Sequence, residues 1–145
     1  MSQHRSPVDD RFESRMSGYY LQPDGARVPF PATLCFDKAD PFAVSLRLRT
    51  ADVRTVTWTF ARQLLIDGAR RPAGVGAVEV RPAFHGGSRL LALTLRSAAG
   101  QADVQLPYEH VAAFLRDTYA AVPSGAEGDL VDWNTELERF RDHES

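Results

Sequence analysis

The chain of 145 residues is poor in several residue types, and each shortage excludes a class of protein. Its single cysteine, Cys35, cannot form an intramolecular disulfide, which is typical of a protein kept in a reducing compartment. No apolar run approaches the roughly 18–20 residues that a membrane-spanning helix needs. Residues 1–15 also lack the apolar stretch of a signal peptide. We therefore expect a soluble, cytoplasmic protein.

The sequence has no excess of basic charge. Seventeen basic and nineteen acidic residues give a formal net charge of −2, which argues against a general electrostatic grip on nucleic acid. Lys38 is the only lysine, and we interpret this bias as GC-rich coding rather than as a function of guanidinium groups. The length and a hydrophobic content of 43% indicate one globular domain.

Alternation of apolar and polar residues predicts the strands of this domain. The expected strands are residues 12–21, 28–36, 42–50, 56–60, 77–81, 89–96 and 102–106. Pro29 and Pro31 cannot donate ladder hydrogen bonds, so we expect the second of these strands at a sheet edge. We also expect Pro82 to stop the strand 77–81, and Gly86-Gly87 to form a turn.

A change of period predicts the helices. A short helix should begin at Ala61, bury Leu64 and Leu65, and end at Asp67-Gly68, because glycine accepts positive φ. Pro107 should open a second helix, since its missing N–H does no harm at a first helical position. Its core-facing residues are spaced at i, i+3 and i+4: Val111, Phe114, Leu115, Thr118 and Val122. A third helix is expected over 130–143, with Trp133, Leu137 and Phe140 on one stripe.

The chain passes twice from an alternating strand directly into a helix, in VTWTFARQLL and in ADVQLPYEHVAAFL. This repetition predicts a single α+β domain of curved antiparallel sheets, in which each of two halves is a meander of strands followed by a helix. We place the domain at residues 12–145 and a flexible, polar tail at residues 1–11. The expected core includes Trp58, Phe60, Leu64, Leu65 and Phe114.

No motif supplies the chemistry of an enzyme. His85-Gly86-Gly87 is similar to an esterase oxyanion turn, but the G-x-S-x-G elbow that such an enzyme needs is missing. Gly74-Val75-Gly76 precedes a strand and does not open a helix, so it is not a dinucleotide loop. The four histidines have no metal-ligand spacing with one another or with Cys35, which we interpret as a small buried hydrophobe. Asp129, Asp132 and Glu136 could cluster carboxylates, although helix capping explains them better. We expect no catalytic residue, cofactor or metal.

Several motifs along the chain form one ordered signature. It begins with Asp40-Pro41-Phe42-Ala43-Val44 and continues through Trp58-Thr59-Phe60-Ala61-Arg62-Gln63-Leu64-Leu65. It then includes Gly68, Pro72, Gly74, Gly76, Val80 and Pro82, and later Leu95, Gly100, Phe114-Leu115, Val122-Pro123, Gly125, Glu127 and Asp132. This signature resembles that of SsgA-like proteins, the sporulation and cell-division proteins of actinomycetes. The resemblance covers nearly the whole chain, from Phe12 to Phe140. Two features depart from it: the longer extension to Arg11, and Ala77-Val78-Glu79-Val80 in place of an acidic-start segment.

The resemblance implies a fold similar to the Whirly and mitochondrial guide-RNA-binding proteins, assembled as a homo-oligomeric trimer. It implies a non-enzymatic role in sporulation-specific septation, in which the protein is recruited from the cytoplasm to the septum. The implied partners are the tubulin-like division protein FtsZ or a related SsgA-like protein. The branch, and with it the direct partner and its surface, stays open. A single-stranded nucleic-acid-binding module is the alternative, since the Whirly-like fold has that function elsewhere.

The candidate signature or partner-binding residues are Asp40, Trp58, Arg62, Arg70 and Arg71. We expect Arg62 or the loop around Asp40 to form an ion pair that fixes the fold, with partner contact as the alternative. Arg70 and Arg71 could form a basic patch with Arg47, Arg49 and Arg62, although a solvated mixed-charge face is the simpler interpretation.

Overall fold

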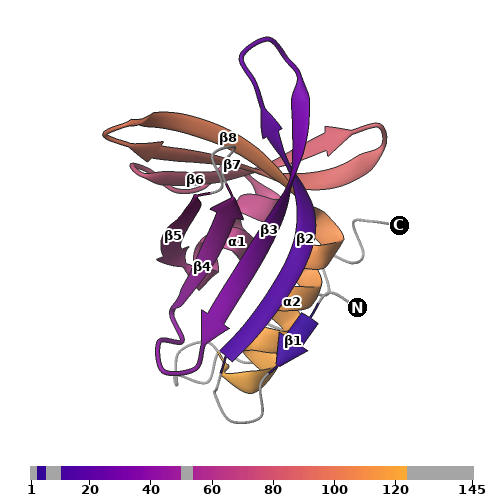
Figure 1. The fold of residues 1–145 in the computed structure, drawn as a ribbon. Coiled ribbons are helices and arrows are strands. Elements are labelled where there is room, and N and C mark those ends of the chain that lie inside the picture. Colours follow the sequence, from indigo (N-terminus) through magenta and orange to yellow (C-terminus); the bar gives the residue numbers. More distant parts are fainter. Residues whose placement is uncertain (1–2, 6–10, 50–53, 124–145) are drawn as a thin grey trace.

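The computed structural model describes residues 3–5 as a strand, and residues 11–49 and 54–123 in full. Two helices lie against one antiparallel sheet (Figure 1). The strands are β1 (Gln3–Arg5), β2 (Arg11–Leu21), β3 (Arg27–Asp37), β4 (Ala43–Arg49), β5 (Thr55–Ala61), β6 (Val78–His85), β7 (Ser88–Ser97) and β8 (Gly100–Pro107). The helices are α1 (Arg62–Arg70) and α2 (Tyr108–Ala121). The predicted helix over 130–143 lies outside the described residues.

The sheet joins two meanders, as the repeated strand-to-helix pattern predicts. Its strand order is β5-β4-β3-β2-β8-β7-β6, and β1 pairs with β2 off this path. The halves meet where Tyr19 and Tyr20 of β2 pair with Gln105 and Val104 of β8. Each half ends in a helix, because β5 runs into α1 and β8 runs into α2 without a connecting loop. The fold class predicted from the sequence is therefore confirmed as a single α+β domain with an antiparallel sheet.

The prediction that the strand with two prolines lies at an edge was wrong, because β3 lies between β2 and β4. Its pairing explains how the prolines are tolerated. The ladder with β4 covers only Ala32–Cys35, so Pro29 and Pro31 lie beyond the end of this ladder, where no described residue pairs with that side of β3. Beyond the pairs that Tyr19 and Tyr20 make with β8, β2 and β3 continue as a two-stranded ribbon that projects from the sheet (Figure 1).

The prediction that the first helix ends at Asp67-Gly68 was also wrong, since α1 continues to Arg70. Gly68 is needed here for its small size. A Cβ at this position would overlap the side chain of Val80 and lie 2.9 Å from the backbone carbonyl carbon of that residue. The absent side chain therefore lets α1 pack directly on β6.

Pro82 does not stop the strand that contains it, because β6 extends to His85 and Pro82 pairs with Leu91. The reason is the edge position of β6. Val80 exchanges two backbone hydrogen bonds of 2.9 Å with Ala73, on the side away from β7. By strand alternation, the Pro82 nitrogen also points away from β7, where no ladder donor is needed. The predicted turn at Gly86-Gly87 is confirmed, with φ of 57° and 83°.

The core lies between the sheet and the two helices, and it includes most of the predicted residues. Phe60, Leu65 and Phe114 are buried, whereas Trp58 and Leu64 are only partly buried against the core. Two predicted bounds were wrong: Phe42 precedes β4 and is 65% exposed, and Ala61 is the exposed last residue of β5 rather than the start of the helix. Ile66 of α1, which the pattern did not single out, is fully buried. Alternation predicted which face of each strand points toward the core. It could not predict which ends of the strands are covered by neighbouring elements.

Candidate functional site

Arg62, at the first position of α1, is a buried cation. Its side chain is 2% exposed, and its guanidinium carbon lies 3.7 Å from the centre of the Tyr119 ring and 4.9 Å from that of Phe36. Nη1 donates a hydrogen bond of 3.1 Å to the carbonyl of Thr118. Stacking on aromatic faces and donation to a carbonyl are contacts that suit a planar guanidinium. Arg62 therefore connects α1, β3 and α2, by contacts other than the expected ion pair.

The electrostatics of this cluster follow from burial. Desolvation lowers the pKa of the Arg62 guanidinium, and the neighbouring Tyr119 opposes that shift. Burial also raises the pKa of the Tyr119 phenol, against the influence of Arg62. At neutral pH the pair is accordingly a cation beside a neutral phenol. We missed Tyr119 and Phe36 from the sequence, because neither is near Arg62 along the chain.

The loop around Asp40 is linked to Arg62 through the backbone. The Arg62 amide donates to the Phe42 carbonyl at 2.8 Å, and the Asp40 amide donates to the Asp37 carbonyl at 2.9 Å. The Asp40 side chain is exposed at the turn between β3 and β4. The structure therefore brings two of the predicted residues to the same end of the sheet.

Trp58 borders an apolar groove between β5 and the hairpin of β7 and β8. The groove has a volume of about 250 Å³, and its apolar lining comes from Tyr20, Leu48, Val56, Trp58, Leu95 and Ala102. Val56 is 39% exposed, although it lies on the core-facing side of β5. The Tyr20 hydroxyl donates to the Arg49 carbonyl at 3.2 Å, which fixes one wall. Trp58 is thus a partly buried aromatic on β5, which is the edge strand among the strands that the structure describes.

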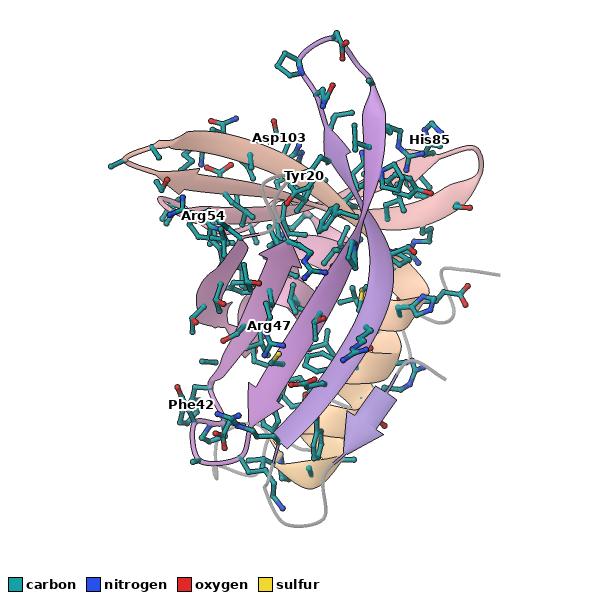
Figure 2. The ribbon with its side chains drawn as sticks, in the orientation of Figure 1. Tyr20, Phe42, Arg47, Arg54, His85 and Asp103 are labelled. Atoms are coloured by element: carbon teal, nitrogen blue, oxygen red, sulfur yellow. The ribbon has the colours of Figure 1, made fainter. Side chains whose placement is uncertain are left out.

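The outer face of the sheet from β2 to β5 is polar, and neither helix covers it (Figure 1). Figure 2 shows Arg47 on this face. Its Nη2 lies 3.6 Å from Oε2 of Glu13 and donates to the Cys35 sulfur at 3.2 Å. These residues line a hollow of about 280 Å³ that also includes Asp40 and Thr59. Cys35 is half-buried, and desolvation raises the pKa of its thiol.

Arg70 and Arg71 lie at the other end of α1 from Arg62, and both are exposed. Arg71 follows the last helical residue, and its amide donates to the Asp67 carbonyl at 3.2 Å. The basic patch considered from the sequence is not formed as expected. Arg62 is buried, and Arg47 lies on the uncovered outer face of the sheet, whereas α1 does not lie on that face (Figure 1). The five candidate residues therefore do not form one site.

The net charge of the whole chain hides an uneven distribution. Residues 11–49 and 54–123 contain fourteen basic and nine acidic side chains, a net charge of +5. Residues 124–145 contain two basic and seven acidic side chains, a net charge of −5. The formal value of −2 therefore describes neither part.

Within residues 11–49 and 54–123, no group of three or more His, Cys, Asp or Glu side chains could hold a metal ion. His85 and His110 are exposed, on a hairpin turn and on α2. The acidic residues Asp129, Asp132 and Glu136 lie outside the described residues. In the part of the chain that the structure describes, no helix is long and apolar enough to cross a membrane.

Known proteins resemble this chain over most of its length. Residues 30–127 match the family described as Streptomyces sporulation and cell division protein, SsgA. The chain belongs to the SsgA family. The sporulation-specific cell division protein SsgB of Frankia casuarinae is 51% identical over 128 residues, which are 88% of this chain and 90% of that protein. The SsgB of Streptomyces coelicolor is 41% identical over 110 residues, or 76% and 80% of the two chains.

Two solved structures of the family have the same fold. One comes from work on how mutations in SsgB correlate to longitudinal cell division during sporulation of Streptomyces coelicolor. Its TM-score is 0.76 at 31% identity, over 94% of this chain and 99% of that one. The SsgA-like sporulation-specific cell division protein of Thermobifida fusca has a TM-score of 0.75 at 32% identity, over 93% and 98% of the chains. The resemblance found in the sequence is confirmed, and the family is one of cell-division proteins.

Proposed function

We propose that this protein acts in sporulation-specific cell division without catalysis, as a homo-oligomeric scaffold that binds FtsZ and helps to place it at septum sites. The observation that supports this role most is the 51% identity, over 88% of the chain, to a relative named as a sporulation-specific cell division protein. The protein is recruited to the septum from the cytoplasm by its protein contacts. A related SsgA-like protein is the other candidate for the direct partner.

The structure offers two surfaces for such contacts. The outer face of the sheet from β2 to β5 carries Arg15, Arg47 and Arg49 among threonine and serine side chains. The last turn of α1 presents Arg70, with Arg71 directly after it. An oligomer, which we expect to be a trimer, would present several copies of either surface, so that weak contacts gain from multivalency.

Retention of purified FtsZ by the immobilised full-length protein tests the proposed partner. We expect retention to be lost in one of two charge-reversal variants, Arg15→Glu/Arg49→Glu on the sheet face or Arg70→Glu/Arg71→Glu after α1. Asp24→Lys, at the exposed tip of the β2–β3 ribbon, is the control that should bind normally. If the immobilised protein retains no FtsZ, whether as a single chain or as an oligomer, recruitment of FtsZ is contradicted. The related SsgA-like protein would then be left as the partner.

Light scattering after gel filtration tests the expected trimer. The mass should be three times the 16.1 kDa of the chain. A mass of 16.1 kDa at all concentrations would contradict a scaffold that acts through multivalency.

A shift assay with single-stranded DNA over a salt series tests the alternative function. Recruitment of a protein predicts no shift, whereas nucleic-acid binding predicts an affinity that falls steeply with salt. A salt-sensitive shift without retention of FtsZ would replace the proposed function with nucleic-acid binding. The likeness to the Whirly fold, on which that alternative is based, stays a prediction.

A further inference from the structure

The groove beside Trp58 is apolar, and it lies next to a sheet edge that none of the described strands pairs with. β5 is the last strand of the sheet order, and five of its seven residues are exposed. An edge strand offers unpaired backbone groups to another extended segment, and an adjacent groove offers a place for its apolar side chains. Arg54, two residues before Val56, adds a positive charge near the amino end of β5 (Figure 2).

We propose that this groove, continued along the edge of β5, is the docking site for the acidic segment 124–145 of the same chain. The segment has a net charge of −5, which is opposite in sign to the net charge of +5 on residues 11–49 and 54–123. It also carries side chains suited to an apolar groove: Leu130, Val131, Trp133, Leu137 and Phe140. Opposite charge brings the segment to the domain, and burial of apolar area holds it there.

The starting point of the segment favours this site. Helix α2 ends at Ala121, and the Thr118 carbonyl in its last turn accepts the hydrogen bond from Arg62, the residue that directly follows β5. The segment therefore leaves the domain near the carboxyl end of β5. The groove lies at the amino half of the same strand, beside Val56 and Trp58.

The length of β5 matches the length of chain that precedes the apolar residues of the segment. Seven strand residues span about 23 Å at roughly 3.3 Å each. An extended chain covers up to about 3.5 Å per residue, so the six residues from Ser124 to Asp129, which precede the helix expected over 130–143, reach about 21 Å. Leu130 and Trp133, which share one face of that helix, can therefore enter the groove while the preceding residues follow the edge of β5. Docking would also cover Trp58 against any partner that uses this groove.

A spin label on the segment tests the docking directly. In the full-length chain with Cys35→Ser, Thr135→Cys provides the only thiol for the label. We expect loss of the amide signals of Thr57, Ala99 and Gly100 and of the Trp58 indole signal, with the signal of Gly25 at the ribbon tip retained. Retention of the groove signals, or equal loss across the domain, would overturn the proposal. So would signal loss in unlabelled chains mixed with labelled ones, because this would assign the contact to a second copy.

Charge-neutralising variants separate the electrostatic contribution from chain proximity. Asp129→Asn/Asp132→Asn should restore the groove signals of the spin-labelled chain, in whole or in large part. Asp9→Asn/Asp10→Asn removes the same number and type of charges at the other end of the chain and should leave the loss unchanged. Equal behaviour of the two variants would overturn the role given to charge. Neither measurement involves FtsZ, so this proposal and the proposed function can fail separately.

Discussion

At the residue scale, Arg62 shows how the family signature can be structural. A buried guanidinium is costly unless its environment compensates the lost hydration. Here the compensation comes from the Tyr119 and Phe36 rings and the Thr118 carbonyl. That carbonyl also accepts a hydrogen bond of 2.9 Å from the Val122 amide, so it keeps one partner if Arg62 is replaced.

Replacement of Arg62 should therefore affect folding before binding. Arg62→Ala should lower the free energy of unfolding by about 2–4 kcal/mol, because it removes the stacked cation and leaves a cavity. Arg62→Met should cost less, since it fills most of the volume without a buried charge. Urea denaturation of both variants measures the difference. Unchanged stability with loss of FtsZ retention would instead make Arg62 a contact residue.

The pH at which Cys35 reacts should reveal its charged neighbours. Burial raises the pKa of the thiol, Arg47 lowers it and Glu13 raises it. The rate of alkylation should accordingly reach its midpoint at a pH above that of an unperturbed cysteine, near 8.5. Arg47→Gln should move the midpoint higher and Glu13→Gln lower. Shifts of the same sign in the two variants would contradict this electrostatic account.

At the scale of elements, the contact of α1 with β6 depends on a missing side chain. Gly68 costs helix propensity of about 1 kcal/mol relative to alanine, and the structure shows what this cost allows. The backbone of α1 approaches Val80 more closely than a methyl group would permit. A pattern of apolar residues along the chain cannot predict such an approach.

Gly68→Ala should consequently destabilise the protein, by about 1–3 kcal/mol, despite the better helix propensity of alanine. In a Val80→Ala background the same substitution should cost less, because part of the overlap is relieved. A double-mutant cycle in urea measures this coupling. Additive effects would show that the helix adjusts without the contact to Val80.

At the scale of the whole molecule, the two meanders share one core and a short backbone connection. The ladder between them involves two pairs, Tyr19 with Gln105 and Tyr20 with Val104. Helix α2, which follows the second meander, contacts β2 and β3 of the first as well as β7 and β8. The halves are therefore held together by this junction of β2 and β8, by the packing of α1 on β6, and by side chains around α2.

This shared core predicts a single unfolding transition. In the Trp133→Phe chain, the fluorescence of Trp58 reports on the first meander, while far-ultraviolet circular dichroism reports on the whole backbone. We expect the two urea curves to coincide, as two-state behaviour requires. An earlier fluorescence transition would show that the edge strand β5 opens independently of the rest.

Features determined by neighbours along the chain could be read from the sequence. The alternation around Val44 and Leu46, the spacing of Val111 and Phe114 in α2, and the turn at Gly86-Gly87 all follow from local backbone preferences. The family signature also identified the correct family. The same patterns did not reveal the roles of the individual residues in that signature.

Only the tertiary structure decided which residues meet across the fold. It placed β3 inside the sheet, extended α1 through Gly68, left Trp58 at an open edge, and buried Arg62 between two rings. The physical reason is that periodicity assigns a side chain to a face, whereas burial depends on what packs against that face. That packing is set by segments far away in the chain, such as Tyr119 against Arg62, and no local pattern records it.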